Sequence, residues 1–219
     1  MLVAIPLFDR FTALDAIGPY EVLSRLPGAE VTFVGERTGP VRSDTRMLAI
    51  TVDAHIDELD ACDIVVVPGG PGTRAMLEPG PLHDWVRRIH AGTQWTTSVC
   101  TGSLILGTAG LLTDLTATTH WAAMDELAPL CAGTTGERVV PHPDARIVTA
   151  AGVSSGIDMA LWLAGQIAGD FVAQAIQLGI EYDPQPPFDA GSPTKAGPDL
   201  VALLADMAVD RRARAETAG

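Results

Sequence analysis

The segment 96–103, Thr-Thr-Ser-Val-Cys-Thr-Gly-Ser, constrains the fold of this chain more than any other. Its β-prone half stops at Cys100, and a run of small and then apolar residues with helical character follows at once. This pattern predicts a sharp strand-to-helix turn, with the Cys100 sulfur near the first N–H groups of a helix. Such N–H groups favour the thiolate, which makes Cys100 a candidate nucleophile. Cysteine is also a small hydrophobe that is often buried and inert, and the turn pattern alone leaves the two interpretations equal.

Strand-like apolar runs alternate with amphipathic helical runs along the 219 residues. This alternation predicts an α/β fold, a three-layer sandwich of flavodoxin-like type with a mostly parallel central sheet. We expect one domain over residues 1–195, with residues 196–219 forming a C-terminal helix and tail packed on it. The clearest central strand, 63–68, is apolar on both faces and ends in the glycine-rich turn 69–72.

The remaining elements are expected at the following positions. Strands are predicted at 2–8, 31–35, 94–99, 116–119, 138–140 and 146–150, with a hairpin within 41–55. Helices are predicted at 15–26, 81–90, 103–112, 121–130, 157–168, 171–179 and 198–211. The proline-rich passage 183–188 is expected to be ordered on the surface because Tyr182 and Phe188 anchor it.

Composition excludes several functional classes. The chain has 27 acidic and 14 basic residues, and its formal net charge of −13 would repel nucleic acid. No apolar run reaches the roughly 18 residues of a membrane span, and the start of the chain lacks the basic leader of a signal peptide. Three cysteines are too few for a disulfide framework, so we expect a cytoplasmic protein with reduced thiols. The cysteines and histidines show no metal-ligand spacing, so no metal site is expected.

Three unusual segments each follow a predicted strand: Leu14-Asp15, Gly69-Gly70 and Cys100-Thr101. Because ligands bind beyond the carboxyl ends of the strands in an open α/β sheet, we expect these segments to meet in one site. The N–H groups of Gly69 and Gly70, with that of Thr101, would then face charge developing on a ligand. A tight strand-to-helix turn explains the two glycines equally well.

Three polar side chains near this site each have two interpretations. Asp15 is either the N-cap of the first helix or a carboxyl group that relays a proton to a thiol, with its pKa raised by burial. The hydroxyl of Thr101 either donates to a reacting atom or bonds to its own backbone. No histidine is adjacent to Cys100, and for His120 a structural role is favoured over an approach through the fold.

These residues resemble a known family. The turn Pro68-Gly69-Gly70, the elbow 98–102 and the run 117–121, Ala-Thr-Thr-His-Trp, are similar to the ThiJ/PfpI superfamily, which has a class I glutamine-amidotransferase-like fold. The isocyanide hydratase branch is most similar, at residues 14–19, 22–23, 68–70, 156–158 and 181–193 as well as at the elbow. Peptidase-like members carry a histidine where this chain has Thr101, and many relatives use a glutamate where it has Asp15.

The resemblance implies hydration of an isocyanide, R–N≡C, to an N-substituted formamide. The sulfur of Cys100 would attack the terminal carbon, and Asp15 or Thr101 would supply the proton that gives a thioimidate. Asp15 would then orient the water that releases the product. The resemblance also implies a small-molecule substrate, no metal or organic cofactor, and a homodimer. The substrate would contact Gly69, Gly70, Ile17 and Trp121.

Three alternatives stay open. Sensory domains of AraC-type activators share the elbow and the Thr-Thr-His-Trp run, so a stand-alone sensory or regulatory domain is one alternative. Those activators continue into a helix-turn-helix region, whereas this sequence ends soon after its last expected helix and is acidic, so no DNA contact is expected. Glyoxalase or deglycase chemistry on small dicarbonyls is the second alternative. A redox-sensing thiol is the third.

Overall fold

The computed structural model of the chain describes residues 1–216, with side chains through residue 207. It divides into two units, Met1–Glu181 and Tyr182–Gly219. The expected division after residue 195, with the last helix packed on the domain, stays a prediction.

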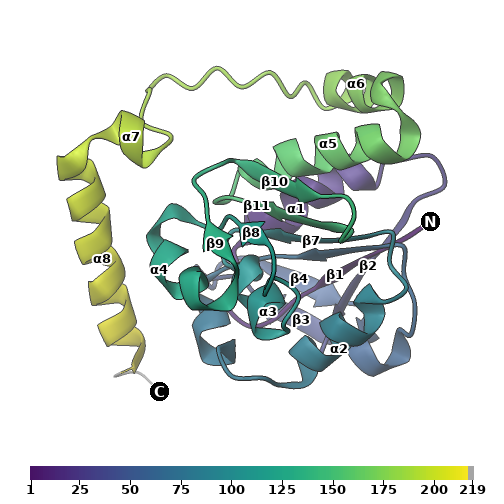
Figure 1. Cartoon of the computed structure of the whole chain (residues 1–219), viewed down its shortest axis with the longest axis horizontal. Helices are drawn as coiled ribbons and strands as arrows, with labels where there is room; N and C mark the ends of the chain where they lie inside the picture. The colour runs from purple at the N-terminus through teal and green to yellow at the C-terminus, as the bar shows by residue number, and fades with distance from the viewer. Residues whose placement is uncertain (217–219) are drawn as a thin grey trace. The chain divides into compact units, whose positions relative to one another are not determined.

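The first unit contains a seven-stranded sheet in the order β10-β11-β7-β6-β1-β2-β5 (Figure 1). Every neighbouring pair is parallel except β10 and β11, which confirms the mostly parallel sheet. The strands are β1 (Leu2–Pro6), β2 (Glu30–Gly35), β5 (Ala54–His55), β6 (Ile64–Val67), β7 (Trp95–Val99), β10 (Val139–His142) and β11 (Ile147–Ala150).

Two small sheets accompany the large one. The strands β3 (Gly39–Arg42) and β4 (Ala49–Val52) pair antiparallel, which confirms the hairpin predicted within 41–55. The strands β8 (Thr116–Ala117) and β9 (Gly133–Thr134) pair parallel.

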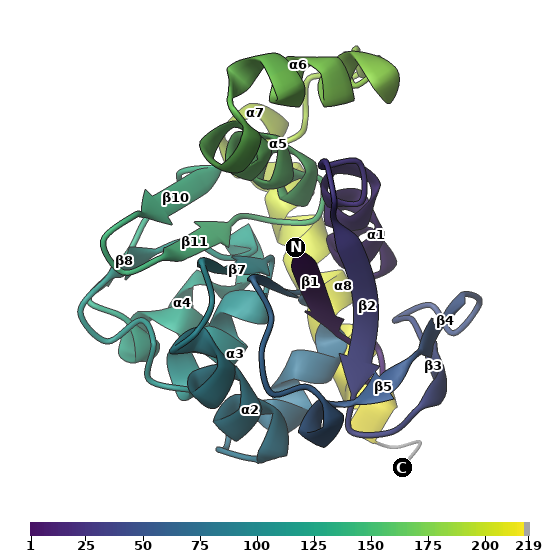
Figure 2. The same cartoon turned by 90° about the vertical axis from the view of Figure 1, so that its right-hand side faces the viewer.

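Helices cover both faces of the large sheet, as Figure 2 shows. One face carries α1 (Ala13–Leu23) and α5 (Ser155–Ala168), and α6 (Asp170–Gly179) packs on α5. The other face carries α2 (Pro81–His90) and α3 (Gly102–Thr108). Shorter elements are η1 (Ile56–Glu58), η2 (Pro71–Met76), η3 (Trp121–Ala123), α4 (Met124–Leu127) and η4 (Ala128–Leu130).

The central strand β6 explains why two hydrophobic cores form. Its side chains alternate between the faces: Ile64 and Val66 join the core under α1 and α5, while Val65 and Val67 join the core under α2 and α3. All four are fully buried, as the sequence predicted for a central parallel strand.

Some predicted elements are wrong in extent. The helix expected over 121–130 is divided into three short pieces, η3, α4 and η4, and Pro129, which has no N–H to donate, lies in the last of them. The helix expected over 103–112 ends at Thr108, shortly before Gly110, which adopts a φ of 79°.

Phe188 is 80% exposed, so its expected role as an anchor of the proline-rich passage is wrong.

The second unit contains α7 (Pro193–Ala196) and α8 (Pro198–Glu216). The Ser192 side chain caps α7 by accepting from the backbone N–H of Lys195 at 3.4 Å. The helix α8 extends beyond its predicted end at residue 211. Within residues 1–216, no helix is both long and apolar enough to cross a membrane.

Candidate active site

The elbow at the end of β7 holds Cys100 in a left-handed conformation, with a φ of 57°. Such a conformation costs about 1–3 kcal/mol for a residue other than glycine, so the surroundings must enforce it. The Cys100 N–H donates to the carbonyl oxygens of Ala150 and Ala151, both at 3.0 Å. Its carbonyl oxygen accepts from the hydroxyls of Ser103 at 3.1 Å and Thr119 at 3.0 Å. These four bonds fix the elbow on both sides of the strained residue.

Glycines allow the ends of β6 and β7 to meet closely. A Cβ on Gly69 would lie 2.4 Å from the Thr101 nitrogen and 2.9 Å from the Cys100 Cβ. A Cβ on Gly102 would lie 2.1 Å from the carbonyl oxygen of Val67. Neither position can therefore hold a side chain. Close packing against the elbow thus requires glycine at position 69, in the turn after β6, in addition to any requirement of the backbone geometry.

Asp15 enters the same region from α1. The N-cap of α1 is Thr12, so the interpretation of Asp15 as the helix N-cap is wrong. The Gly69 N–H donates to Asp15 Oδ2 at 3.0 Å, and the Thr12 N–H donates to the Gly69 carbonyl at 2.8 Å. The other oxygen, Oδ1, is buried and has no nitrogen or oxygen partner among the described residues. The Cys100 thiol faces this carboxyl group.

Burial dominates the electrostatics of the pair. It raises the pKa of Asp15 from 3.8 to about 7, although bonds from Gly69 and Cys100 lower it in part. Burial also raises the pKa of the Cys100 thiol above its ordinary value of 9, and the charge of Asp15 raises it further. The N–H groups of Thr101 and Val153 face the sulfur and lower its pKa, but by less. The N–H groups at the helix start thus favour the thiolate, as predicted, but desolvation outweighs them and the pKa of the thiol rises overall.

The N–H groups of Gly69 and Gly70 are both engaged within the protein. Gly69 donates to Asp15, and Gly70 donates to Thr101 Oγ1 at 2.9 Å. The Thr101 hydroxyl in turn donates to the Gly70 carbonyl at 3.2 Å. In this structure the two glycine N–H groups thus orient a carboxyl and a hydroxyl instead of facing open space, contrary to the expectation of free donors.

The structure brings Asp15, Gly69, Gly70, Cys100 and Thr101 together at the carboxyl ends of the strands, as the sequence predicted. Ile17 lies on α1 two residues beyond Asp15 and is partly buried. Trp121 is also partly buried. Contact of Ile17 and Trp121 with a substrate stays a prediction.

His120 has a structural environment in this state. Its Nδ1 accepts from the Ala122 N–H at 3.2 Å, and its ring centroid is 5.5 Å from that of Trp121. Burial lowers the pKa of His120 from 6.5, and the charge of Arg74 lowers it further. The neutral imidazole therefore caps the start of η3.

The sequence did not predict two contacts at the elbow, which are made by the N–H of Val153 and the hydroxyl of Thr119. Val153 presents its N–H to the sulfur from a left-handed conformation, with a φ of 41°. Nothing in a Gly-Val-Ser run predicts this backbone geometry. Thr119 bonds to the elbow carbonyl, and its place in the Thr-Thr-His-Trp run was the available signal.

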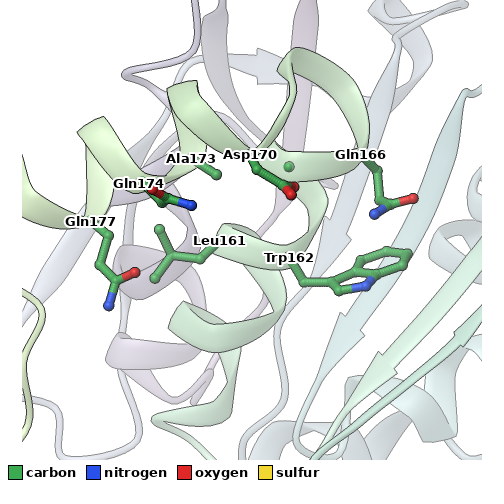
Figure 3. Close-up of a pocket in the computed structure, with 8 residues that line it drawn as sticks. Leu161, Trp162, Gln166, Asp170, Ala173, Gln174 and Gln177 are labelled. Atoms are coloured by element: carbon green, nitrogen blue, oxygen red, sulfur yellow. The ribbon is translucent and has the colours of Figure 1, made fainter.

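Two surface hollows lie elsewhere. One lies between α5 and α6, and Figure 3 shows its lining of Leu161, Trp162, Gln166, Asp170, Ala173, Gln174 and Gln177. The other includes His90, Asp114, Asp144 and Arg146. No residue of the site around Cys100 lines either hollow. Among the described residues, no three His, Cys, Asp or Glu side chains are grouped as metal ligands.

The fold and site together define a class: an α/β protein with a cysteine at a strand-to-helix elbow, faced by backbone N–H groups and a carboxyl group. Residues 1–166 match the model of the DJ-1/PfpI family, and the chain belongs to this family. It is 43% identical over 190 residues to an isonitrile hydratase of Pseudomonas putida, covering 87% of this chain and 82% of the relative.

The chain is also similar to a transcriptional regulator and to a solved structure of the same family. The chain is 31% identical to the HTH-type transcriptional regulator GbdR of Pseudomonas aeruginosa, covering 81% of this chain but 49% of the regulator. The crystal structure of a ThiJ/PfpI family protein from Pseudomonas syringae superposes with a TM-score of 0.90 at 34% identity, covering 95% of this chain and 86% of the other. The fold class predicted from the sequence is thereby confirmed.

Proposed function

We propose that the chain is an isocyanide hydratase that uses Cys100 as a covalent nucleophile. The single observation that carries this proposal is the Asp15 carboxyl beside the Cys100 thiol, in a chain 43% identical to an isonitrile hydratase. A carboxyl group with a pKa of about 7 can accept a proton and return it at neutral pH, as a general base and acid must.

The first half of the reaction forms a thioimidate. The ionised Asp15 accepts the thiol proton while the sulfur of Cys100 forms a bond to the terminal carbon of R–N≡C. Asp15 then returns the proton to that carbon, which gives R–N=CH–S–Cys100. The N–H groups of Thr101 and Val153 stabilise negative charge on the sulfur before the bond forms.

The second half releases the formamide. Asp15 takes a proton from water as the oxygen adds to the carbon, and it passes this proton to the substrate nitrogen. The carbon–sulfur bond then breaks with its electron pair on sulfur, and the proton from the new hydroxyl returns to the thiolate. The products are R–NH–CHO and the free thiol, so neither an oxidant nor a metal is consumed.

The two catalytic candidates besides Cys100 have different parts in this scheme. Asp15 carries the proton, because its carboxyl group faces the thiol. Thr101 contributes its N–H to the sulfur, while its hydroxyl is bonded at both ends to Gly70. The homodimer and the contacts of Ile17 and Trp121 with substrate belong to the same proposal.

An activity panel tests the proposal. The purified chain is offered an alkyl isocyanide, methylglyoxal and a peptide, with Cys100→Ser as the control. We expect loss of the isocyanide and appearance of the formamide with wild type alone. Turnover of methylglyoxal would favour the deglycase alternative. Absence of turnover with all three compounds would favour a sensory domain, an alternative that the similarity to GbdR supports.

A second cysteine, Cys131, serves as a matched control for Cys100. Cys131 is partly buried, and its sulfur donates to the Gly133 carbonyl at 3.2 Å. We expect Cys131→Ala to retain turnover while Cys100→Ala abolishes it without unfolding the chain. Measurable turnover by Cys100→Ala would contradict covalent catalysis.

A further inference from the structure

The hydroxyl of Thr119 reaches the elbow from a distant part of the chain. It donates to the Cys100 carbonyl at 3.0 Å across 19 positions in sequence, and Thr119 is fully buried. The second hydroxyl on this carbonyl belongs to Ser103, three residues along the same turn. Ser103 belongs to the same turn and moves with the elbow. Among the described residues, only Thr119 therefore connects this carbonyl oxygen to a separate segment of the chain.

The segment that carries Thr119 is itself anchored. The N–H of Thr118 donates to Oγ1 of Thr149 on β11 at 3.0 Å. The ring of His120 packs against Gly152, where a Cβ would lie 2.6 Å from the His120 Cδ2. Thr119 is therefore held between an anchor on β11 and one on the turn that precedes Val153.

We propose that Thr119 is a positioning residue: its hydroxyl holds the Cys100 carbonyl and thereby keeps the sulfur facing Asp15 and the N–H groups of Thr101 and Val153. The strained φ of Cys100 provides the reason, since a residue in this conformation relaxes when the groups that enforce it are removed. Relaxation at Cys100 moves the sulfur away from its N–H donors. The catalytic part of this inference rests on the proposed function.

The test compares three variants. Thr119→Val keeps the shape but removes the hydroxyl, and Thr119→Ser keeps the hydroxyl. Thr118→Val is the matched control, because the Thr118 hydroxyl is equally buried but has no hydrogen-bond partner among the described residues. Two quantities are measured for each variant: kcat and KM for an alkyl isocyanide, and the rate of iodoacetamide alkylation of Cys100 as a function of pH.

For Thr119→Val we expect kcat to fall roughly 5- to 30-fold, the effect of losing one buried hydrogen bond, with KM nearly unchanged. Its alkylation profile should shift from that of wild type, because the sulfur moves relative to Asp15, whose charge raises the thiol pKa, and relative to the N–H groups, which lower it. Thr119→Ser should restore both quantities to near the wild-type values. Thr118→Val should match wild type in both.

Four results would overturn the inference. The first is wild-type kcat and alkylation in Thr119→Val, and the second is an equal loss in Thr118→Val, which would indicate packing. The third is failure of Thr119→Ser to restore the alkylation profile. The fourth is a Thr119→Val chain that does not fold, which would make the hydroxyl a requirement of the fold. If wild type turns over no isocyanide, the proposed function fails, but the alkylation profiles still decide the role of Thr119.

Discussion

The backbone N–H of Gly69 donates to Oδ2 of Asp15 at 3.0 Å, which fastens a buried carboxyl group to the turn after the central strand β6. A second bond runs the other way, from the Thr12 N–H to the Gly69 carbonyl at 2.8 Å. The start of α1 and the end of β6 are thus joined by two reciprocal bonds. This arrangement explains how the side chain of Asp15 reaches Cys100, which lies 85 positions later in the sequence.

Replacing Asp15 by Asn should remove the proton carrier and keep the shape. We expect Asp15→Asn to lower kcat/KM for an isocyanide by roughly 10²- to 10⁴-fold, as is typical of acid–base groups. The rate of isocyanide loss measures the effect, with Asp114→Asn, an exposed carboxyl group, as the control. An unchanged rate would show that the carboxyl group serves only to bond to Gly69.

The same substitution should change the pH dependence of stability. Asp15 titrates at about 7 in the folded chain and near 3.8 when unfolded. Between these values the folded chain holds a proton that the unfolded chain releases, so this group lowers the free energy of unfolding as pH rises through the window. Asp15→Asn removes the titration, so its Tm relative to wild type should be higher at pH 8 than at pH 4. Thermal denaturation at both pH values measures the difference, and a constant difference would contradict the raised pKa.

Gly69 should tolerate no side chain. The added Cβ in Gly69→Ala would lie 2.4 Å from the Thr101 nitrogen, so the elbow must shift. We expect a loss of about 1–3 kcal/mol in the free energy of unfolding, together with loss of isocyanide turnover. Gly136→Ala, at an exposed glycine with nothing within 4 Å of the added Cβ, is the matched control and should leave both quantities unchanged. Full activity in Gly69→Ala would refute the steric argument.

The hydroxyl of Thr101 should affect turnover because it accepts a hydrogen bond from the Gly70 N–H. Thr101→Val leaves the Gly70 N–H without its acceptor, at a cost of about 1–3 kcal/mol for a buried donor. We expect slower isocyanide turnover with Cys100 alkylation preserved, because the Thr101 N–H still faces the sulfur. Thr108→Val is the control, since that buried hydroxyl has no partner among the described residues. Equal losses of turnover and alkylation would indicate a packing effect.

The sequence predicted those features that depend on local pattern and on topology. The apolar run at 64–67 identified the central strand, and the parallel sheet placed Asp15, Gly69 and Cys100 at one edge. The Asp15 pKa rises as the proton-relay interpretation required, because the carboxyl group is buried. These predictions succeeded because the carboxyl ends of parallel strands converge whatever the loop details are.

Features that depend on burial in the tertiary structure could not be predicted from the sequence. The pKa of Cys100 rises instead of falling, since desolvation depends on everything packed around the sulfur. The donors of Gly69 and Gly70 are taken by side chains from α1 and from the start of α3, a pairing that local sequence does not encode. The left-handed backbone of Val153 and the exposure of Phe188 likewise depend on the final fold.

The raised pKa of the buried Cys100 thiol bears on how fast this thiol reacts with peroxide. Peroxide attacks the thiolate, so a thiol whose pKa is held high is converted slowly to sulfenic acid. Such a dormant nucleophile suits turnover better than peroxide sensing.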